Sequence, residues 1–469
     1  MLSISNKHEE FLMMAILLLG SFLTTLAETL LNNALPDIMA ELHVAQTSAQ
    51  WLSTGYFLVA GITMPTAAYF TNRVKLKPLF VSIMAIFLTG LIISATANSF
   101  IVLLIGRMIQ AVSVGISMPL VQNVLTLIFP VEQRGFVLGI AGVVISLGPA
   151  VGPTLSGIIV DHFSWRMLFI FLIPIAALAL ILGLVCVKNL TPTRPDSLDV
   201  PSLLLSTFGF GTLLFGFSNI GTGVVSGGLV AGMLLVGLVL ITGFVRRQLR
   251  LKQPLLELRV FLAPSFRRVV GLATLAAIAL MGPELIVPLY NQNVRGLNAT
   301  TSGLTLLLGA VLMAVISLVS GKLFDHFGIK KLAFFGFGSA VLASVPMLWF
   351  DNQTSPLMIA LIYAVRISGL TFVYMPLSVL GLNALPQKYV VAGSTIIVTV
   401  QQLATSLGTA LLVATTSWGH QAGVRRGLSS ESAVALGYQW AFIVMLVITA
   451  GCWLGSHWLK NRTTAELPN

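Results

Sequence analysis

Charged residues are scarce in this sequence, at 9% of 469 residues, whereas apolar residues make up 56% of it. The mean hydropathy is +0.95. A soluble domain could not bury so much apolar surface in one core, so the composition excludes a soluble globular protein. It indicates a chain that crosses a membrane many times.

Cysteine and histidine are also rare, with two and six copies. Cys186 and Cys452 lie far apart in apolar runs, and the histidines are scattered near the ends of such runs. Neither pattern has the spacing of a disulfide framework or of a metal site. We therefore expect no metal, no cofactor and no catalytic residues, which argues against a membrane enzyme.

Fourteen apolar segments have about the length that crosses a bilayer, roughly 20 residues. They begin near residues 11, 47, 79, 100, 135, 166, 200, 228, 268, 302, 331, 356, 391 and 436. The sequence thus predicts an all-α integral membrane protein with 14 transmembrane helices.

The formal net charge of +11 comes from 26 Lys and Arg against 15 Asp and Glu. If the N-terminus is cytoplasmic, most basic residues fall on cytoplasmic connections, for example Arg73, Lys75 and Lys77 and the stretch 246–268. Basic residues gather on the cytoplasmic side of membrane proteins. We expect a multi-pass protein of the cytoplasmic membrane with both termini in the cytoplasm, and no nucleic-acid partner.

Two acidic residues fall inside predicted spans. Glu28 lies in the uncharged run 11–35, and Glu284 lies at a similar depth in the run 269–290, next to Pro283. A charge at the centre of a spanning helix costs about 2.5–3.5 kcal/mol, so such acids are candidates for holding and releasing a proton. The alternative is a protonated or arginine-paired acid that fixes helix packing. A proline frees backbone groups that a cavity can satisfy, so we expect Glu284 to face one.

A basic turn recurs along the chain. AYFTNRVKLKP follows the second predicted span, and GKLFDHFGIKK follows the tenth. The repeat predicts two six-helix bundles, residues 1–190 and 261–469, related by a pseudo-twofold axis along the membrane normal, with two extra spans in residues 191–260 between them.

Two further spans carry unusual residues. Arg107 and Gln110 share a face of the fourth span, and a buried arginine needs a partner, either Glu28 or backbone carbonyl groups. The fifth span, GVVISLGPAVGPTLSG, has small residues and prolines at a spacing of four. Such spacing lets helices pack closely, and prolines bend a span.

Together these residues resemble the major facilitator superfamily, in particular the branch of fourteen-spanning drug:proton antiporters of the Qac and Emr type. SWRMLFIFLIP resembles the SWR motif of that branch, with Leu172 in place of the usual asparagine. TLLNNALPDI resembles its first-span motif, with Ala27 at the usual aspartate position and Glu28 next to it. The fifth span resembles the antiporter motif, through Gly142, Gly148, Pro149, Gly152, Pro153 and Gly157.

The resemblance also implies roles for single residues. Arg107 matches an arginine linked to proton coupling, and YAVRISGLTFVYMPLS places Arg366 inside the second half. Gln401 and Gln402 stand where the branch has an arginine and a glutamine. The first basic turn departs from the family pattern at Asn72 and Lys75. Its second copy implies a cytoplasmic conformational latch formed by Gly321, Asp325, Gly328, Lys330 and Lys331.

These features predict a monomeric exporter that exchanges protons for lipophilic, cationic drugs or toxic compounds by alternating access. Proton and substrate would compete for Glu28 or Glu284, because burial disfavours an unpaired charged carboxylate. Candidate cavity residues are Phe22, Tyr56, Phe57, Gln110, Tyr290, Arg366 and Tyr374. The alternative on the same scaffold is export of a specific metabolite, lipid or antibiotic. A channel fits less well, since repeated halves with prolines and buried charges suit alternating access.

Overall fold

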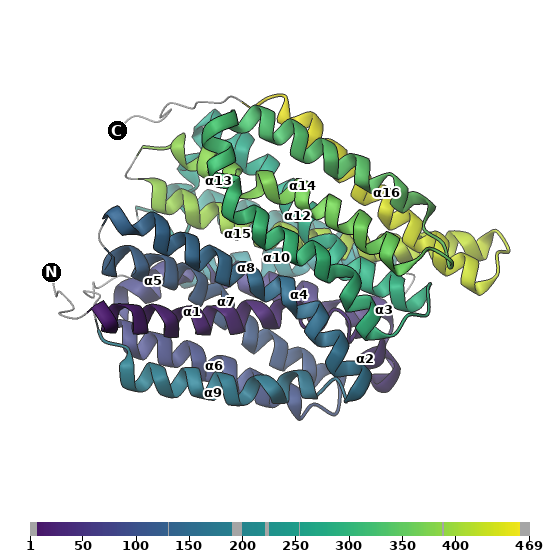
Figure 1. The fold of residues 1–469 in the computed structure, drawn as a ribbon, viewed down its shortest axis with the longest axis horizontal. Helices are drawn as coiled ribbons and strands as arrows, with labels where there is room; N and C mark the ends of the chain where they lie inside the picture. The colour runs from purple at the N-terminus through teal and green to yellow at the C-terminus, as the bar shows by residue number, and fades with distance from the viewer. Residues whose placement is uncertain are drawn as a thin grey trace.

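The computed structural model describes residues 7–129, 131–189, 199–220, 225–252, 254–386 and 389–459. All regular structure in these ranges is helical, and the long helices run side by side (Figure 1). The elements up to the extra spans are α1 (Lys7–Thr29), α2 (Leu35–Leu42), α3 (Gln46–Ala49), α4 (Trp51–Thr63), α5 (Thr66–Arg73), α6 (Leu76–Ala95), α7 (Phe100–Ile128), α8 (Val131–His162) and α9 (Met167–Cys186).

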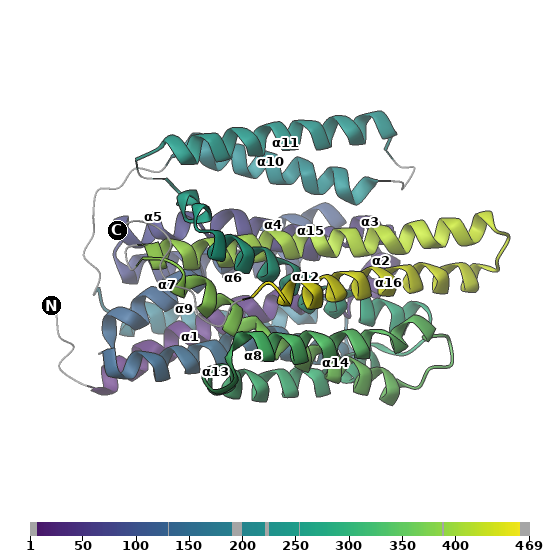
Figure 2. The ribbon, with the colours of Figure 1, turned by 90° about the horizontal axis from the view of Figure 1, so that it is seen from above.

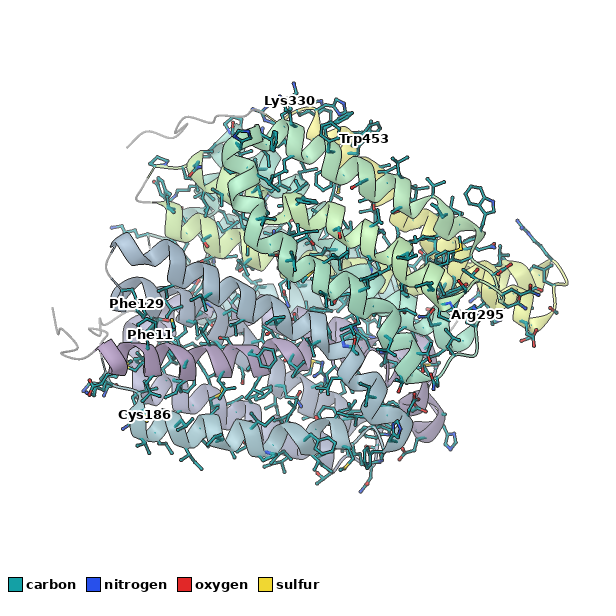
Figure 3. All side chains as sticks on the ribbon, viewed as in Figure 1. Phe11, Phe129, Cys186, Arg295, Lys330 and Trp453 are labelled. Carbon is teal, nitrogen blue, oxygen red and sulfur yellow. The ribbon has the colours of Figure 1, made fainter. Side chains whose placement is uncertain are left out.

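The remaining elements begin with the hairpin of α10 and α11. They are α10 (Val200–Asn219), α11 (Gly227–Arg250), η1 (Leu258–Leu262), α12 (Pro264–Asn293), α13 (Ala299–Ser344), η2 (Pro346–Trp349), α14 (Pro356–Asn383), α15 (Val390–Arg425) and α16 (Ser430–Ser456). Figure 3 places Phe11 and Phe129 at one end of the molecule, where α1 begins, and Arg295 at the opposite end. We call these the terminal end and the far end.

Twelve helical segments of the described residues are long and apolar enough to span a membrane. Two of them lie in α13, which is interrupted at Gly328, where φ is 74°. The other two predicted spans fall on α4 with α5, which are separated at Met64 and Pro65, and on the 32-residue α8. The all-α membrane fold is confirmed, and the count of 14 spans stays a prediction.

The helices form two packed groups and a side pair. Helices α1, α4, α6, α7, α8 and α9 contact one another, as do α12 to α16. The groups meet mainly where α8 contacts α13 and α4 contacts α15. Helices α10 and α11 pair beside the bundle, and α10 contacts α15 and α4 (Figure 2). This arrangement agrees with the predicted repeat, whose boundaries at residues 190 and 260 remain predictions.

Two glycine crossings mark equivalent places in the two groups. Helices α6 and α7 cross at Gly90 and Gly106, where a Cβ on Gly90 would lie 2.8 Å from the Gly106 carbonyl oxygen. Within the α13–α14 pair, a Cβ on Gly369 would lie 2.3 Å from the Gly336 carbonyl oxygen. Only glycine allows backbones to approach this closely. The same device therefore joins the third and fourth helices of each group.

The first span is broken directly after Glu28. Helix α1 ends at Thr29, and the turn 30–34 leads into α2. The turn holds Asn32 and Asn33, whose side chains reach four other helices. Asn32 bonds to Ser53 of α4 and to the Glu284 carbonyl of α12, and Asn33 bonds to the Pro153 carbonyl of α8 and to Ser302 of α13. The break lets one short turn join both helix groups.

Candidate functional site

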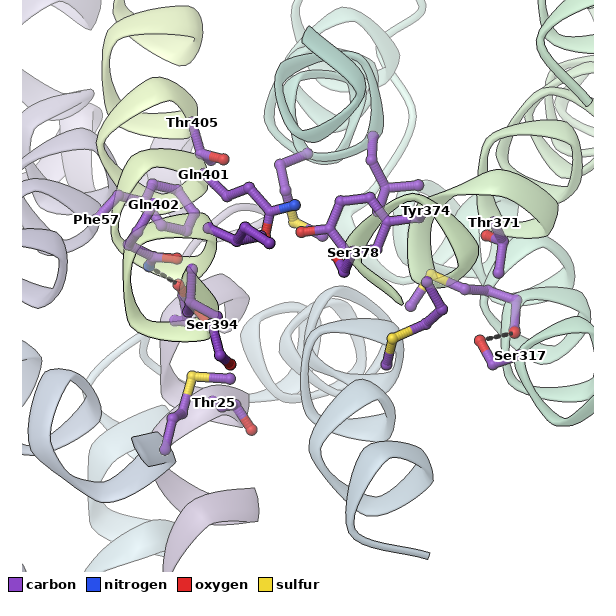
Figure 4. A pocket seen from close by; sticks show the side chains of 18 of the residues that line it. Thr25, Phe57, Ser317, Thr371, Tyr374, Ser378, Ser394, Gln401, Gln402 and Thr405 are labelled. Carbon is purple, nitrogen blue, oxygen red and sulfur yellow. Dashed lines mark hydrogen bonds between the residues drawn. The ribbon is translucent and has the colours of Figure 1, made fainter. Parts of the chain in front are cut away.

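A cavity of about 270 Å³ lies between the two helix groups (Figure 4). Its walls come from α1, α4, α7, α12, α13, α14 and α15. Glu28 supplies the one carboxyl group among the lining residues, and none of them is basic. The other polar lining residues are Thr25, Ser317, Thr371, Ser378, Ser394, Gln401, Gln402 and Thr405.

Flexible apolar side chains form much of the remaining wall. Met118, Met281, Met313 and Met375 line the cavity together with Phe57 and Tyr374. Methionine is unbranched and polarizable, so a methionine-rich wall adapts to ligands of different shapes. The lining is therefore suited to a small apolar molecule that carries a positive charge.

The Glu28 carboxylate forms a hydrogen bond to a residue of the other helix group. It is 8% exposed and accepts a hydrogen bond from Nε2 of Gln402 on α15, shown by the dashed line beside Gln402 in Figure 4. Helices α1 and α15 belong to different groups, so this bond links the two groups at the cavity wall.

Arg107 is fully buried and is satisfied mainly by backbone oxygens. Its Nη1 donates to the carbonyl of Ala27 at 2.8 Å and to Oε1 of Gln110 at 3.0 Å, and its Nε donates to the carbonyl of Leu52 at 3.2 Å. The guanidinium also lies 4.0 Å from the ring centroid of Tyr56. Of the two expected partners, the structure thus shows backbone carbonyl groups rather than the Glu28 carboxylate.

Arg366 occupies the equivalent place in the second group. Its Nη1 donates to the carbonyl of Ala279 at 2.8 Å, its Nε to Ser344 at 2.9 Å and its Nη2 to Thr449 at 3.1 Å. Each arginine therefore holds a backbone carbonyl of the first long helix of its own group. Arg366 is not among the cavity-lining residues.

The two arginines fix the register between the groups. If Ala27 corresponds to Ala279, then Glu28 corresponds to Leu280 and Asn32 corresponds to Glu284. Leu280 lines the cavity as Glu28 does. Glu284 lies one helical turn, about 6 Å, beyond this level. On this correspondence the two acids differ by one helical turn, and their similar depth in the membrane stays a prediction.

Glu284 is buried away from the central cavity. It is 4% exposed and lines a narrow void with Pro153, Tyr363 and Met313. Its Oε2 has no hydrogen-bond partner among the described residues, and its carbonyl accepts a bond from Asn32 at 3.1 Å. Met313 lines both the void and the cavity, so its side chain lies between them.

The structure places the predicted cavity residues in different surroundings. Phe57 and Tyr374 line the cavity, whereas Phe22 packs partly buried against the apolar core. The Tyr56 hydroxyl donates to the Thr24 carbonyl at 3.0 Å. Gln110 donates to Gly90 and Ser94 beside Arg107.

Tyr290 belongs to an aromatic cluster and not to the cavity wall. Its ring contacts Phe350, Tyr438 and Phe442, and its hydroxyl donates to the Asp351 carbonyl at 2.7 Å. Sequence reasoning did not select Gln402, the methionines or the serines for the cavity. The only signal for Gln402 was its place in the altered arginine-glutamine pair.

The antiporter-like stretch of α8 packs closely against the other helix group. A Cβ on Gly157 would lie 2.2 Å from the carbonyl oxygen of Ala299. Thr154 donates to the Gly303 carbonyl at 3.0 Å, and the Asp161 carboxylate accepts from the backbone amides of Ala299 and Thr300 at 2.9 and 2.7 Å. This stretch of α8 therefore closes onto the N-terminal end of α13.

The same stretch also packs on α1. Cβ atoms on Gly148 and Gly152 would lie 2.5 and 2.4 Å from the hydroxyl oxygens of Thr25 and Thr29. Gly142, Pro149, Asn72 and Asp325 lie outside the residues whose side chains are described. The latch predicted around Asp325 is therefore untested, although Gly328 does break α13 there.

Several hydrogen bonds between the groups lie at the level of Glu28 or farther toward the far end. Besides Asp161 they include Gln402 to Glu28, Ser406 to Thr54 and Gln292 to Asn33. The cavity extends the other way, because Ser394 near the start of α15 and Leu382 near the end of α14 both line it. These bonds hold the two groups together at the far end, and the cavity extends toward the terminal end.

The SWR stretch has a structural explanation at the far end. Arg166 forms an ion pair with Glu41 at 2.6 Å and donates to the Ala97 carbonyl, and the Trp165 indole donates to the same carboxylate at 2.7 Å. These bonds hold the start of α9 against α2 and the end of α6.

Comparisons with known proteins agree with this architecture. The chain is 42% identical over 446 residues to the MFS-type transporter YcnB of Bacillus subtilis, covering 95% of this chain and 94% of the relative. It is 35% identical over 472 residues to the lincomycin resistance protein LmrB of Bacillus subtilis, covering 97% of each. It is 27% identical over 402 residues to a multidrug resistance protein B homolog of Mycobacterium tuberculosis, covering 84% and 74%.

Solved structures show the same fold at low sequence identity. A bacterial homolog of the human lysosomal transporter Spinster matches with a TM-score of 0.70 and 14% identity, covering 98% of this chain and 100% of that one. A D-xylose–proton symporter matches with a TM-score of 0.63 and 14% identity, covering 93% and 97%. The sequence profile of the Major Facilitator Superfamily matches residues 17–409. The chain therefore belongs to the major facilitator superfamily and is a multi-pass membrane transporter, not an enzyme.

Proposed function

We propose that the protein exports lipophilic, cationic compounds in exchange for protons. The observation that carries this proposal is the cavity, in which Glu28 is the one carboxyl group and no described lining residue is basic. An ionised Glu28 attracts a cation, and a proton on the same group removes that attraction. Proton and substrate then exclude each other, which is the condition for exchange.

Alternating access follows from the contacts between the groups. The far end is held by Asp161 on the N-terminus of α13 and by Asn33 in the broken first span. Release of substrate at the far end requires these bonds to break while the terminal end closes. We place both termini in the cytoplasm of a cell-membrane protein, with 14 spans, two six-helix halves and a monomeric working unit.

The two other charged residues of the coupling set have different parts in this scheme. Arg107 holds the carbonyl next to Glu28 and thereby fixes the direction of that side chain. Glu284 has a carboxyl oxygen without a hydrogen-bond partner among the described residues, faces a narrow void, and serves as the second proton site. Protonation of Glu284 lowers the free-energy cost of burying its side chain, because a neutral carboxylic acid costs less to bury than a charged carboxylate.

The more specific candidate is export of an antibiotic. It is favoured by the 35% identity, over nearly the whole chain, to a lincomycin resistance protein. A cavity of about 270 Å³ would not hold a bulky antibiotic without opening further, so this candidate requires a wider cavity in another state.

The test uses cells that produce the protein and are loaded with a lipophilic cationic dye. Efflux should stop when an ionophore collapses the proton gradient, and Glu28→Gln should remove the proton-dependent part. Glu431→Gln, at an exposed acid near the start of α16, is the matched control and should leave efflux unchanged. Efflux that continues without a gradient, or that is equal in both variants, would refute the proposal.

A further inference from the structure

Two neighbouring amides of α15 line the cavity, but only one of them contacts the acid. Gln402 donates to Glu28, while Nε2 of the 8%-exposed Gln401 has no partner among the described residues. Gln402 is partly exposed and also lines the cavity, so the side of its amide that does not face Glu28 is open to a ligand.

The chemistry of this pair allows two bonded states. An ionised carboxylate only accepts hydrogen bonds, whereas a protonated carboxyl group can also donate one. An amide presents NH₂ on one side and a carbonyl oxygen on the other, in nearly the same shape. By turning over about its last bond, Gln402 can donate to ionised Glu28 or accept from protonated Glu28.

We propose that Gln402 turns its amide over when Glu28 gains or loses a proton, and that this makes the cavity select protonated amines over quaternary ammonium ions. The inference rests on the proposed exchange function and deepens it by naming the substrate class. With Glu28 ionised, the Gln402 carbonyl is left toward the cavity beside the carboxylate. An ammonium N–H can bond to it, and a quaternary ammonium has no such hydrogen.

The opposite state disfavours the same ligand. With Glu28 protonated, Gln402 presents its NH₂ group to the cavity, and neither group offers an ionised acceptor to a cation. Through the orientation of the Gln402 amide, binding of the ligand depends on whether Glu28 is protonated. Gln402 acts through Glu28 and is a positioning residue.

Other charged or titratable groups surround Glu28. Arg107 approaches its backbone carbonyl at 3.5 Å from α7, Tyr56 and Tyr374 face it from α4 and α14, and Glu284 lies on α12. Arg107 is held by carbonyl groups, and tyrosine ordinarily titrates near pH 10. Glu284 is the remaining competitor, so the measurements are made in the Glu284→Gln variant as well as in the wild type.

The first measurement needs no ligand. Infrared spectra of the purified protein in nanodiscs are recorded between about pH 5 and pH 9, and the Glu28 carboxyl band is assigned by its loss in Glu28→Gln. Gln402→Met should move this band to the frequency of a free acid and raise its titration midpoint by about one unit, because the bond lost from the ionised form is stronger than the bond lost from the protonated form. Gln353→Met, at an exposed glutamine outside the cavity, should change neither.

The second measurement compares two cations of nearly equal size. Binding of lidocaine and of its N-ethyl quaternary derivative is measured by calorimetry at about pH 7. Lidocaine should bind roughly tenfold more tightly than its quaternary derivative to the wild type and to Gln353→Met, the ratio expected for one charged hydrogen bond, and about equally tightly to Gln402→Met.

The outcomes separate the inference from the function beneath it. Equal affinity of the wild type for the two probes, or an unchanged Glu28 band in Gln402→Met, overturns the role of Gln402 and leaves the exchange function standing. A Glu28 carboxyl band that does not titrate in this range, or binding of neither probe, overturns the proposed proton and cation site together with the inference. Gln402→Leu provides a second test if Gln402→Met does not fold, as judged by size-exclusion chromatography.

Discussion

Asp161 should control how readily the far end opens, and Asp161→Asn tests this. The carboxylate of Asp161 accepts from two amides at the N-terminus of α13, where a negative charge is favoured by the helix dipole. Each bond to a charged acceptor contributes about 1.5–3 kcal/mol when it is buried. Asparagine keeps the shape and one acceptor oxygen but loses the charge.

The expected size follows from the surroundings of Asp161. Asp161 is exposed, so solvent weakens its interactions. We therefore expect the substitution to destabilise the state with a closed far end, relative to the open state, by roughly 1–2 kcal/mol. This corresponds to about a 5- to 30-fold change in the ratio of the closed to the open state. The change should favour the open state, because the bonds are between the helix groups and must break when the far end opens.

Spin labels at the far end measure that ratio. Ser164→Cys and Asn352→Cys, both exposed, place one label on each group after Cys186 and Cys452 have been replaced. Asp161→Asn should increase the fraction of long distances between the labels.

Asp351→Asn is the matched control, because Asp351 accepts from Gln353 and Thr354 within its own loop. If Asp161→Asn leaves the distances unchanged, or if Asp351→Asn shifts them equally, Asp161 does not hold the far end closed.

Three further predictions concern stability, each measured by thermal unfolding of the purified protein. Gly369→Ala should destabilise by about 1–3 kcal/mol because its Cβ would lie 2.3 Å from the Gly336 oxygen, whereas Gly451→Ala in α16, with nothing within 4 Å, should have little effect. Arg107→Ala and Arg366→Ala should each lower the unfolding temperature and the protein yield, because buried carbonyl groups lose their donors, and full stability of either variant would contradict this. The bidentate bond from Arg247 holds the pKa of the Asp199 carboxyl below its usual value of 3.8, so its stabilisation is present at neutral pH and is lost as the pH falls through the lowered value. Asp199→Asn should therefore cost about 1 kcal/mol at pH 7 and weaken the loss of stability in acid, and an unchanged pH profile would refute it.

The sequence alone predicted the all-α membrane fold and part of the cavity wall, including Glu28. Long apolar runs predict membrane helices directly. Glu28 stood out because it is a charged residue within one of these runs, and it lines the cavity. The basic turns predicted a repeat, and the glycine crossings at Gly106 and Gly369 agree with it. These features are local in the chain, so the sequence carries them.

The remainder depended on packing between distant segments. The partners of Arg107 are mainly backbone carbonyl groups, which every residue has, so no side-chain pattern could identify them. The sequence could not set the register of Glu284 against Glu28, because that register depends on the bonds of the two arginines to the first long helices. Tyr290 points into an aromatic cluster and not into the cavity, which depends on the rotation of α12 against its neighbours.

The contact between Asn32 and the Glu284 carbonyl has a geometric consequence. These positions correspond in the two halves, and the midpoint of any two points related by a twofold rotation lies on the rotation axis. Because the two residues touch, both lie within a few ångströms of that axis. The bond between them therefore ties the broken first span of one half to the first long helix of the other half close to their common axis, and any motion that separates the halves at this level must break it.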